Sequence, residues 1–377
     1  MFRLVLVTLT VRCFVSVDLT PKVFTIARDH NGRFELEIGT PPQKFSTAIN
    51  FQFAHLIVAD EDCGKHLTDC QRYCKDSEIR NLYCNPLCSP FSSVMRDYCP
   101  EQKYSKSNSS TYSKDLGYWM QRLDTTSRPL FGAFVLDELV VKGYIKGHLP
   151  FSAGQVEFVS GLLLDKRWDL MSCFETTCFG LAPSDTSNRS SIVMQTYKAG
   201  LLEKPIVSLS IGEYDGYVTL GGYDEENCTG WTNYEKANYT GWILKVDEIN
   251  FFGLTFPGPN YITIENQEII TIPHYALDQI LNSGVLTGND YSDYYYGQCD
   301  YDEHGTFNFN FTIDNKEWTL SIDAAPYNET ICGLEIVTSE NLYEDEPWIL
   351  KLFSWSHVCM SFDYETKMIG LANSIYR

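Results

Sequence analysis

The sequence predicts an all-β protein built from two similar lobes, and three observations lead to that prediction. Apolar residues make up 44% of the 377-residue chain and charged residues only 21%, with 24 Tyr and 22 Phe, a composition typical of β-rich globular proteins. Short β-type runs are interrupted by Gly, Pro, Asn and Asp at intervals of about 8 to 12 residues. Residues 45–58 and 261–273 repeat one order, in which an unusual tetrapeptide separates two apolar strands.

The individual elements follow from local patterns. The clearest strand patterns cover residues 34–39, 134–141, 206–211 and 217–221. Helical patterns are brief and are confined to two segments. These segments are residues 191–199 and, after a proline, residues 275–281.

The domain organisation that we expect has three parts. Residues 1–17 resemble a signal peptide, because a charged Arg3 precedes a short apolar run. Residues 18–204 form the first lobe, with a cysteine-rich insertion at 61–100, and residues 205–377 form the second lobe. The signal predicts a secreted, extracellular protein, with the lysosome as the alternative location. Six Asn-x-Ser/Thr sequons suit the same route: Asn108, Asn188, Asn227, Asn238, Asn310 and Asn328.

The charge of the chain argues against nucleic acid as a partner. Lys and Arg number 29 and Asp and Glu 49, so the formal net charge is −20. Nucleic acid is therefore not an expected partner.

After the signal, no stretch reaches the roughly 20 apolar residues of a membrane span. The seven histidines lack metal-ligand spacing, so we expect no metal and no cofactor, and we expect a monomer.

Several motifs resemble those of the pepsin-like aspartic peptidases. Ile38–Gln43, followed by an apolar strand and the turn at Asn50, is similar to the start of that family's first lobe. Phe179–Ala182 resembles the segment that threads the first active-site loop. Pro347–Leu350 and Ile369–Ala372 resemble the C-terminal signature. The resemblance covers residues 23–373 and implies a bilobal pepsin-like fold with an interlobe cleft.

The first catalytic loop of this resemblance is altered. The family uses two Asp-Thr-Gly loops whose carboxylates share one proton, so that one activates water and the other polarises the scissile carbonyl. Here the loop is Asn50-Phe51-Gln52-Phe53. A carboxamide at Asn50 forms hydrogen bonds but does not act as a general base. The sequence thus predicts a degenerate site with no catalytic residue.

The second loop and the flap also depart from the family pattern. An ungapped alignment puts Ile264 at the second catalytic position, and a shift by one residue puts Glu265 there. Lys351 stands where the family has Gly, and Thr125 stands where it has the flap tyrosine. Because Phe51 and Phe53 flank the first position, we also expect the centre of the cleft to be apolar and partly filled by these rings, Ile264 and Lys351.

The cysteines predict disulfides. Without Cys13 of the signal, 12 of the 13 cysteines remain, an even number in an exported chain. The resemblance implies the pair Cys299–Cys332, and Cys228 with Cys359 is the expected second bridge; Cys173 and Cys178 then remain as a pair. The pairing inside the insertion stays open, and zinc is the less favoured alternative there. The insertion cysteines are Cys63, Cys70, Cys74, Cys84, Cys88 and Cys99.

Three functions are compatible with these features. The favoured one is a secreted, glycosylated and catalytically inactive relative of the peptidases that binds a peptide or protein in its cleft. Such a cleft holds an extended peptide by strand-like hydrogen bonds. The alternative is an active aspartic endopeptidase, which fold alone would suggest. The third is an inhibitory or storage role in which the cleft is unused.

Overall fold

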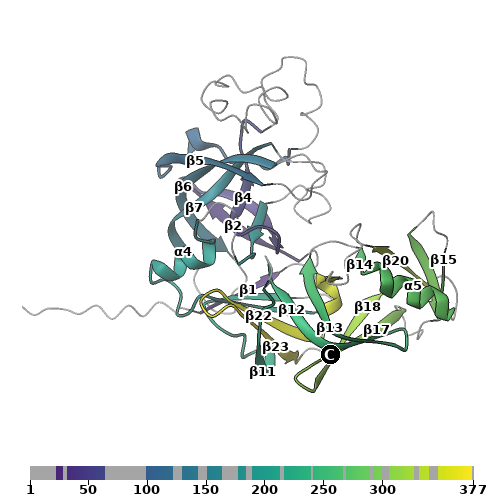
Figure 1. Cartoon of the computed structure of the whole chain (residues 1–377). Coiled ribbons are helices and arrows are strands. Elements are labelled where there is room, and N and C mark those ends of the chain that lie inside the picture. The colour runs from purple at the N-terminus through teal and green to yellow at the C-terminus, as the bar shows by residue number, and fades with distance from the viewer. Residues whose placement is uncertain are drawn as a thin grey trace, which may run out of the picture.

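Strands dominate the structure, a computed structural model, and confirm the all-β prediction. The described residues are 23–28, 32–63, 99–121, 130–142, 151–163, 177–183, 189–212, 216–238, 241–265, 269–288, 293–298, 305–326, 331–338 and 347–375. Within these ranges the strands form three sheets. In Figure 1 the sheet of the first lobe lies at the top, with helix α4 (Ile192–Lys198) beside it. Helix α5 (His274–Ser283) lies at the right, with strands of the second lobe.

The first lobe contains a seven-stranded sheet in the order β2-β3-β8-β4-β7-β6-β5. Its longest strands, β6 and β7, form an antiparallel pair whose register shifts twice. Gly132 of β6 lies so close to β7 that an added Cβ would meet the Ser160 carbonyl oxygen at 2.6 Å. The strands are β2 (Arg33–Ile38), β3 (Gln43–Asn50), β4 (Leu56–Ala59), β5 (Lys114–Gln121), β6 (Leu130–Lys142), β7 (Phe151–Leu163) and β8 (Thr177–Gly180).

The second lobe contains a ten-stranded sheet in the order β15-β16-β20-β14-β21-β13-β12-β17-β18, with β19 paired to β20. Strand β18 shows the alternation of a half-buried strand, with Trp318, Leu320 and Ile322 buried. The strands are β12 (Ile243–Phe251), β13 (Leu254–Glu265), β14 (Ile270–Ile272), β15 (Leu286–Gly288), β16 (Tyr294–Gln298), β17 (Thr306–Ile313), β18 (Lys316–Asp323), β19 (Ala325–Pro326), β20 (Ile331–Thr338) and β21 (Trp348–Lys351).

A six-stranded sheet in the order β1-β10-β9-β22-β23-β11 combines the first described strand with strands from the second half of the chain. One continuous core of buried side chains joins it to both other sheets, from Phe24 through Phe179 to Ile264. The two lobes are therefore packed against each other. The strands are β1 (Phe24–Arg28), β9 (Ile206–Ile211), β10 (Gly216–Leu220), β11 (Cys228–Glu235), β22 (Val358–Asp363) and β23 (Met368–Ser374).

The helices confirm the two helical predictions. Helix α4 (Ile192–Lys198) begins after Ser191, whose hydroxyl oxygen accepts a hydrogen bond from the Met194 N–H at 3.3 Å. Helix α5 (His274–Ser283) follows a proline and ends at Gly284, which adopts a left-handed conformation with φ 74°. Short 3-10 turns, η3 (Lys106–Asn108) and η5 (Leu352–Trp355), complete the regular structure of the described residues.

The internal repeat is visible in the strand pairing. In the first lobe β3 runs parallel to β8, and in the second lobe β13 runs parallel to β21. In both pairs, the end of the earlier strand lies beside a strand that begins more than 80 residues later in the sequence. This shared arrangement confirms two similar lobes, and it positions the two loops considered below.

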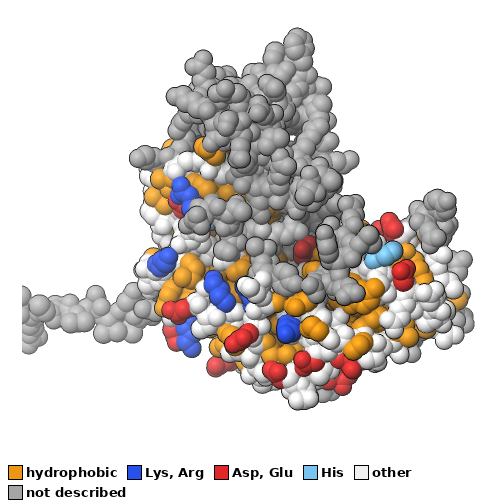
Figure 2. Space-filling view, in the orientation of Figure 1, with side chains coloured by type: hydrophobic (Ala, Val, Ile, Leu, Met, Phe, Trp, Pro, Cys, Tyr) orange, Lys and Arg blue, Asp and Glu red, His pale blue; other side chains and the backbone are white. Residues whose placement is uncertain are grey.

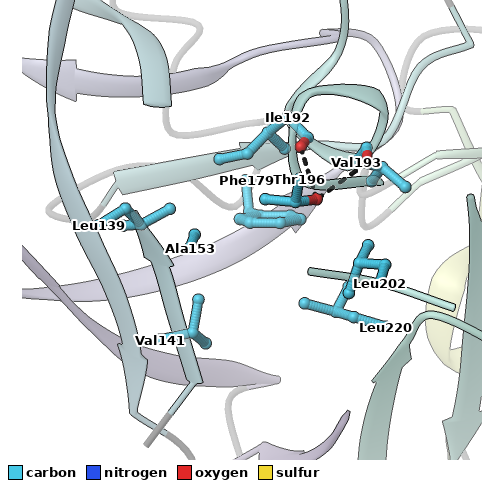
Figure 3. A pocket seen from close by; sticks show the side chains of 9 residues that line it. All are labelled: Leu139, Val141, Ala153, Phe179, Ile192, Val193, Thr196, Leu202 and Leu220. Atoms are coloured by element: carbon cyan, nitrogen blue, oxygen red, sulfur yellow. Dashed lines mark hydrogen bonds between the residues drawn. The ribbon is translucent and has the colours of Figure 1, made fainter. Parts of the chain in front are cut away.

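A small apolar cavity of about 10 Å³ lies beneath α4 in the first lobe (Figure 3). Leu139, Phe179 and Leu202 are among its lining residues. Its polar lining residue, Thr196, donates its hydroxyl to the carbonyl oxygens of Ile192 and Val193 at 3.0 and 2.9 Å. Because the Thr196 hydroxyl is already hydrogen-bonded within the helix, the cavity offers no free polar group, and we interpret it as a packing defect of the core.

Candidate functional site

The first loop is organised by the crossing of two strands. Asn50 ends β3 in register with Gly180 of β8. The backbone N–H of Gly180 donates to the His55 carbonyl at 3.0 Å, and the N–H of Leu181 donates to the Asn50 carbonyl at 2.7 Å. A Cβ on Gly180 would lie 2.4 Å from the carbonyl oxygens of Phe53 and His55. Only glycine therefore allows β8 to pass through this loop.

The side chain of Asn50 acts as a turn cap. It is 1% exposed, and its Oδ1 accepts hydrogen bonds from the backbone N–H groups of Gln52 at 2.8 Å and Phe53 at 3.1 Å. An Asn side chain that holds the backbone two and three residues later is an Asx-type turn. Asn50 thereby holds the backbone of the first loop in a tight turn.

The second loop meets the first through Glu265 rather than Ile264. Glu265 ends β13 in register with Lys351 of β21, as Asn50 ends β3 in register with Gly180. Ile264 is 3% exposed and belongs to the hydrophobic core. The ungapped alignment that put Ile264 at the second position is therefore wrong by one residue, and the internal repeat pairs Asn50 with Glu265.

A hydrogen bond joins the two loops. Gln52 donates from Nε2 to Glu265 Oε2 at 2.9 Å, across 213 residues of sequence. Burial raises the pKa of the Glu265 carboxyl above its ordinary value, and the Gln52 hydrogen bond opposes this by stabilising the charged form. The centre of the site therefore holds one carboxyl group and one amide group in direct contact.

The aromatic residues of the first loop are buried in the core. The buried Phe51 ring contacts Phe362 of the second half of the chain, with 5.5 Å between centroids. Phe53 is fully buried and contacts Trp119 at 5.9 Å. Phe51, Phe53 and Ile264 are all buried, and the expectation that these side chains and Lys351 fill the centre of the cleft stays a prediction.

Beside the first loop, one backbone carbonyl group connects β8 to two side chains from the second half of the chain. The Leu181 carbonyl oxygen accepts hydrogen bonds from Trp242 Nε1 at 2.5 Å and from the Tyr364 hydroxyl at 2.7 Å. Burial raises the pKa of Tyr364, so the phenol remains a proton donor. Sequence inspection missed this contact, because these side chains lie 61 and 183 residues from Leu181 along the chain.

A family model described as "Eukaryotic aspartyl protease" matches residues 33–374. The chain belongs to the eukaryotic aspartyl protease family. Among curated relatives, it is 27% identical over 243 residues to "Aspartic protease 2" of Necator americanus, a match that covers 58% of this chain and 54% of the relative. It is 22% identical over 194 residues to "Plasmepsin IV" of two Plasmodium falciparum isolates, a match that covers 48% of this chain and 41% of each relative. The chain thus spans about half the length of the curated relatives it matches.

Among the described residues, the disulfide-bonded cysteines of this aspartyl protease family member agree with the sequence prediction. The structure contains the expected bridge Cys228–Cys359 and joins Cys63 to Cys99 at the base of the insertion. Cys178 and Cys332 are also disulfide-bonded. Other expected members lie outside the described residues: Cys70, Cys74, Cys84, Cys88, Cys173 and Cys299.

The base of the insertion is a closed stem formed by residues 59–63 and 99–106. Asp60 pairs with Tyr104 in an isolated parallel bridge. The Lys106 ammonium lies 2.8 Å from Asp60 Oδ2, and the Cα atoms of Cys63 and Cys99 are 5.9 Å apart. Within the part of the chain that the structure describes, no group of three or more His, Cys, Asp or Glu residues forms a metal site.

The sequons differ in their surroundings. Asn108 and Asn238 are exposed, and Asn310 is partly buried in β17. Asn227 is 6% exposed, and its Nδ2 donates to Asp224 Oδ2 at 2.8 Å. A glycan at Asn227 is incompatible with this packing, which corrects the expectation for that site.

The remaining expected positions fall outside the structure described. Asn188, Asn328 and the flap position Thr125 lie outside the described residues. Among the residues described, no helix has the length and apolar character needed to cross a membrane. On the face shown in Figure 2, acidic and basic side chains are interspersed.

Proposed function

We propose that this chain is a secreted, glycosylated and catalytically inactive member of the aspartyl protease family that binds an extended peptide or a protein segment in its interlobe cleft. The family's aspartic mechanism needs two carboxyl groups that share one proton. The observation that carries the proposal is the state of Asn50, whose Oδ1 is engaged by two backbone N–H groups.

The single acid of the site supports the same conclusion. Glu265 faces the amide of Gln52 rather than a second carboxyl group. An amide neither takes up nor releases a proton in the range from about pH 2 to 7. A water molecule at this position would therefore lack the paired acid and base that activate it in the family mechanism.

Retention of the scaffold favours a binding role. The strand crossings, the Leu181 contacts and the continuous core keep the lobes together although the acid pair is lost. An extended peptide binds between lobes through backbone hydrogen bonds that need no acid pair. The active endopeptidase remains the alternative, because fold alone would suggest it.

A proteolysis assay tests the proposal. We expect the purified chain to release no peptides from denatured haemoglobin between about pH 2 and 7, compared with a mock purification. An active pepsin-like protease serves as the positive control under the same conditions. Turnover that a transition-state inhibitor such as pepstatin blocks would support the alternative and refute the proposal.

Secretion and glycosylation are tested separately. We expect glycopeptides at the exposed residues Asn108 and Asn238 when the full chain is expressed with its leader in a eukaryotic host. The peptide that contains Asn227 should carry no glycan, because that side chain is buried. Retention of the chain inside the cell without glycans would contradict the secretory part of the proposal, and delivery to lysosomes would support the alternative location.

A further inference from the structure

One face of the ten-stranded sheet carries hydroxyl and amide groups instead of apolar side chains. Strands β17 and β18 alternate, so that their apolar residues are buried and the residues between them are exposed or partly buried. The strand register places four uncharged polar residues opposite one another across neighbouring strands. We call this set the polar row, and it consists of Thr255 of β13, Asn250 of β12, Asn310 of β17 and Thr319 of β18.

The polar row lies in an uncharged part of a strongly acidic chain. On one side of the row Asn308 pairs with Ser321. On the other side lies Thr312, and the acidic residues Glu248 and Glu317 stand opposite it on the two neighbouring strands. The formal net charge of the whole chain is −20. A neutral occupant rich in hydrogen-bonding groups suits this face, because Asn, Ser and Thr side chains offer donors and acceptors without charge.

Asn310 marks where such an occupant is attached. It begins the sequon Asn310-Phe311-Thr312, and this sequon lies within a strand of eight residues, whereas sequons are expected in surface loops. Asn310 is partly buried, and its Oδ1 is buried without a hydrogen-bond partner among the described residues. Thr312 lies on the same face of the strand, because side chains two residues apart point to one side.

The spacing of the strands brings a sugar on Asn310 into contact with the polar row. Residues opposite each other on antiparallel strands have Cβ atoms about 4.5–5.5 Å apart. The first sugar ring is bonded to Nδ2 of Asn310 and is about as wide as this spacing, so it comes to lie over Asn250 or Thr319. The amide and hydroxyl groups of these two residues match the hydroxyl and acetamido groups of the ring as hydrogen-bond partners.

We propose that Asn310 carries an N-linked glycan whose first sugars pack on the polar row and form part of the folded second lobe. This inference rests on the proposed secretion and glycosylation, and it adds a structural role for one glycan. In the transfer step, Asn310 Nδ2 forms a bond to the anomeric carbon of an oligosaccharide. The bond from that carbon to the pyrophosphate of a lipid-linked donor breaks, and one amide proton is released with the lipid pyrophosphate.

Glycan release from the folded protein tests the packing. The full chain is secreted from a eukaryotic host, glycopeptide mass spectrometry measures the occupancy of each sequon, and peptide N-glycosidase is then added without denaturant. We expect Asn310 to be occupied and its glycan to be released about tenfold more slowly than the glycan on the exposed Asn238. The reason is that the enzyme reaches a packed glycan only after local opening.

Variants of the polar row make this result specific. Asn250→Ala and Thr319→Ala remove the groups that contact the sugar and leave the sequon intact. Each should speed release at Asn310 about threefold, the effect of roughly one hydrogen bond, without changing release at Asn238. Thr287→Ala is the matched control, because Thr287 is an exposed threonine in β15, at the other end of the same sheet. It should leave both rates unchanged.

Thermal unfolding tests the structural role of the glycan. Thr312→Val removes the sequon and keeps a β-branched side chain with a high strand preference, so a lower unfolding midpoint reports the lost glycan. Thr312→Ser keeps the sequon and should unfold closer to wild type. Thr240→Val removes the sequon of Asn238 and should not change the midpoint. An unchanged midpoint for Thr312→Val would overturn the structural role.

The outcomes separate this inference from the proposed function. An unoccupied Asn310 beside an occupied Asn238 would overturn the inference and leave secretion and glycosylation intact. Release at Asn310 that is as fast as at Asn238, or that Asn250→Ala and Thr319→Ala do not change, would also overturn it. A wild-type dimer in light scattering, with β17 and β18 protected from hydrogen exchange, would make a second copy the occupant and overturn it. Absence of glycans at every sequon would overturn both proposals.

Discussion

Replacing Asn50 by alanine should destabilise the protein, because Asn50 serves the backbone rather than chemistry. Its Oδ1 accepts from the N–H of Gln52 at 2.8 Å and from the buried N–H of Phe53 at 3.1 Å. A buried donor left without a partner costs about 1–3 kcal/mol, and water relieves part of this cost at the partly buried Gln52 N–H. Together the two lost hydrogen bonds predict a loss of roughly 2–4 kcal/mol in the free energy of unfolding.

Asn50→Asp is the matched variant for this prediction. A carboxylate keeps an oxygen in the same place, so we expect most of the stability to be retained. The assay is urea unfolding near pH 7 followed by intrinsic fluorescence, with hydrogen exchange at the amides of Gln52 and Phe53 as the local measurement. If Asn50→Ala unfolds within about 0.5 kcal/mol of wild type, which is the ordinary range of a surface substitution, the capping argument is wrong.

Two further predictions concern the site and the disulfides. The double variant Asn50→Asp with Glu265→Asp should remain inactive on denatured haemoglobin although it restores two acids, because Phe51 is buried where the family loop has threonine; pepstatin-sensitive activity would show that this remodelling is unimportant. Cys228→Ala with Cys359→Ala should lower the free energy of unfolding by up to about 5 kcal/mol, since the bridge closes a loop with a sequence separation of 131. Denaturation under non-reducing conditions measures it, and an unchanged midpoint would contradict the loop-entropy argument.

Local patterns were sufficient for much of the fold. The run at 206–211 coincides with β9, and the segments that follow Ser190 and Pro273 form α4 and α5. These elements are predictable because strand alternation and helix capping depend on residues close in sequence. The bridge Cys228–Cys359 could be proposed because the resemblance supplied a frame for both strands.

The site was less predictable because it depends on long-range pairing. The register of β13 against β21 decides that Glu265, and not Ile264, lies opposite the first loop. A shift of one residue moves every side chain to the other face of a strand, so a count along the sequence cannot settle such a position. In the same way, the sequence does not reveal which buried cluster accepts Phe51 or Phe53.

The closed stem beneath the insertion has a consequence for how this chain could change over time. Cys63 and Cys99 are covalently joined, and Asp60 and Tyr104 pair beside them. The two ends of the insertion are therefore held at a fixed position relative to the rest of the first lobe. The entropy of closing a loop grows only slowly with its length. Insertions, deletions or an unrelated sequence between these two cysteines would therefore leave the seven-stranded sheet unaffected. This position is a natural attachment point where new recognition sequences can be exchanged while the scaffold is preserved.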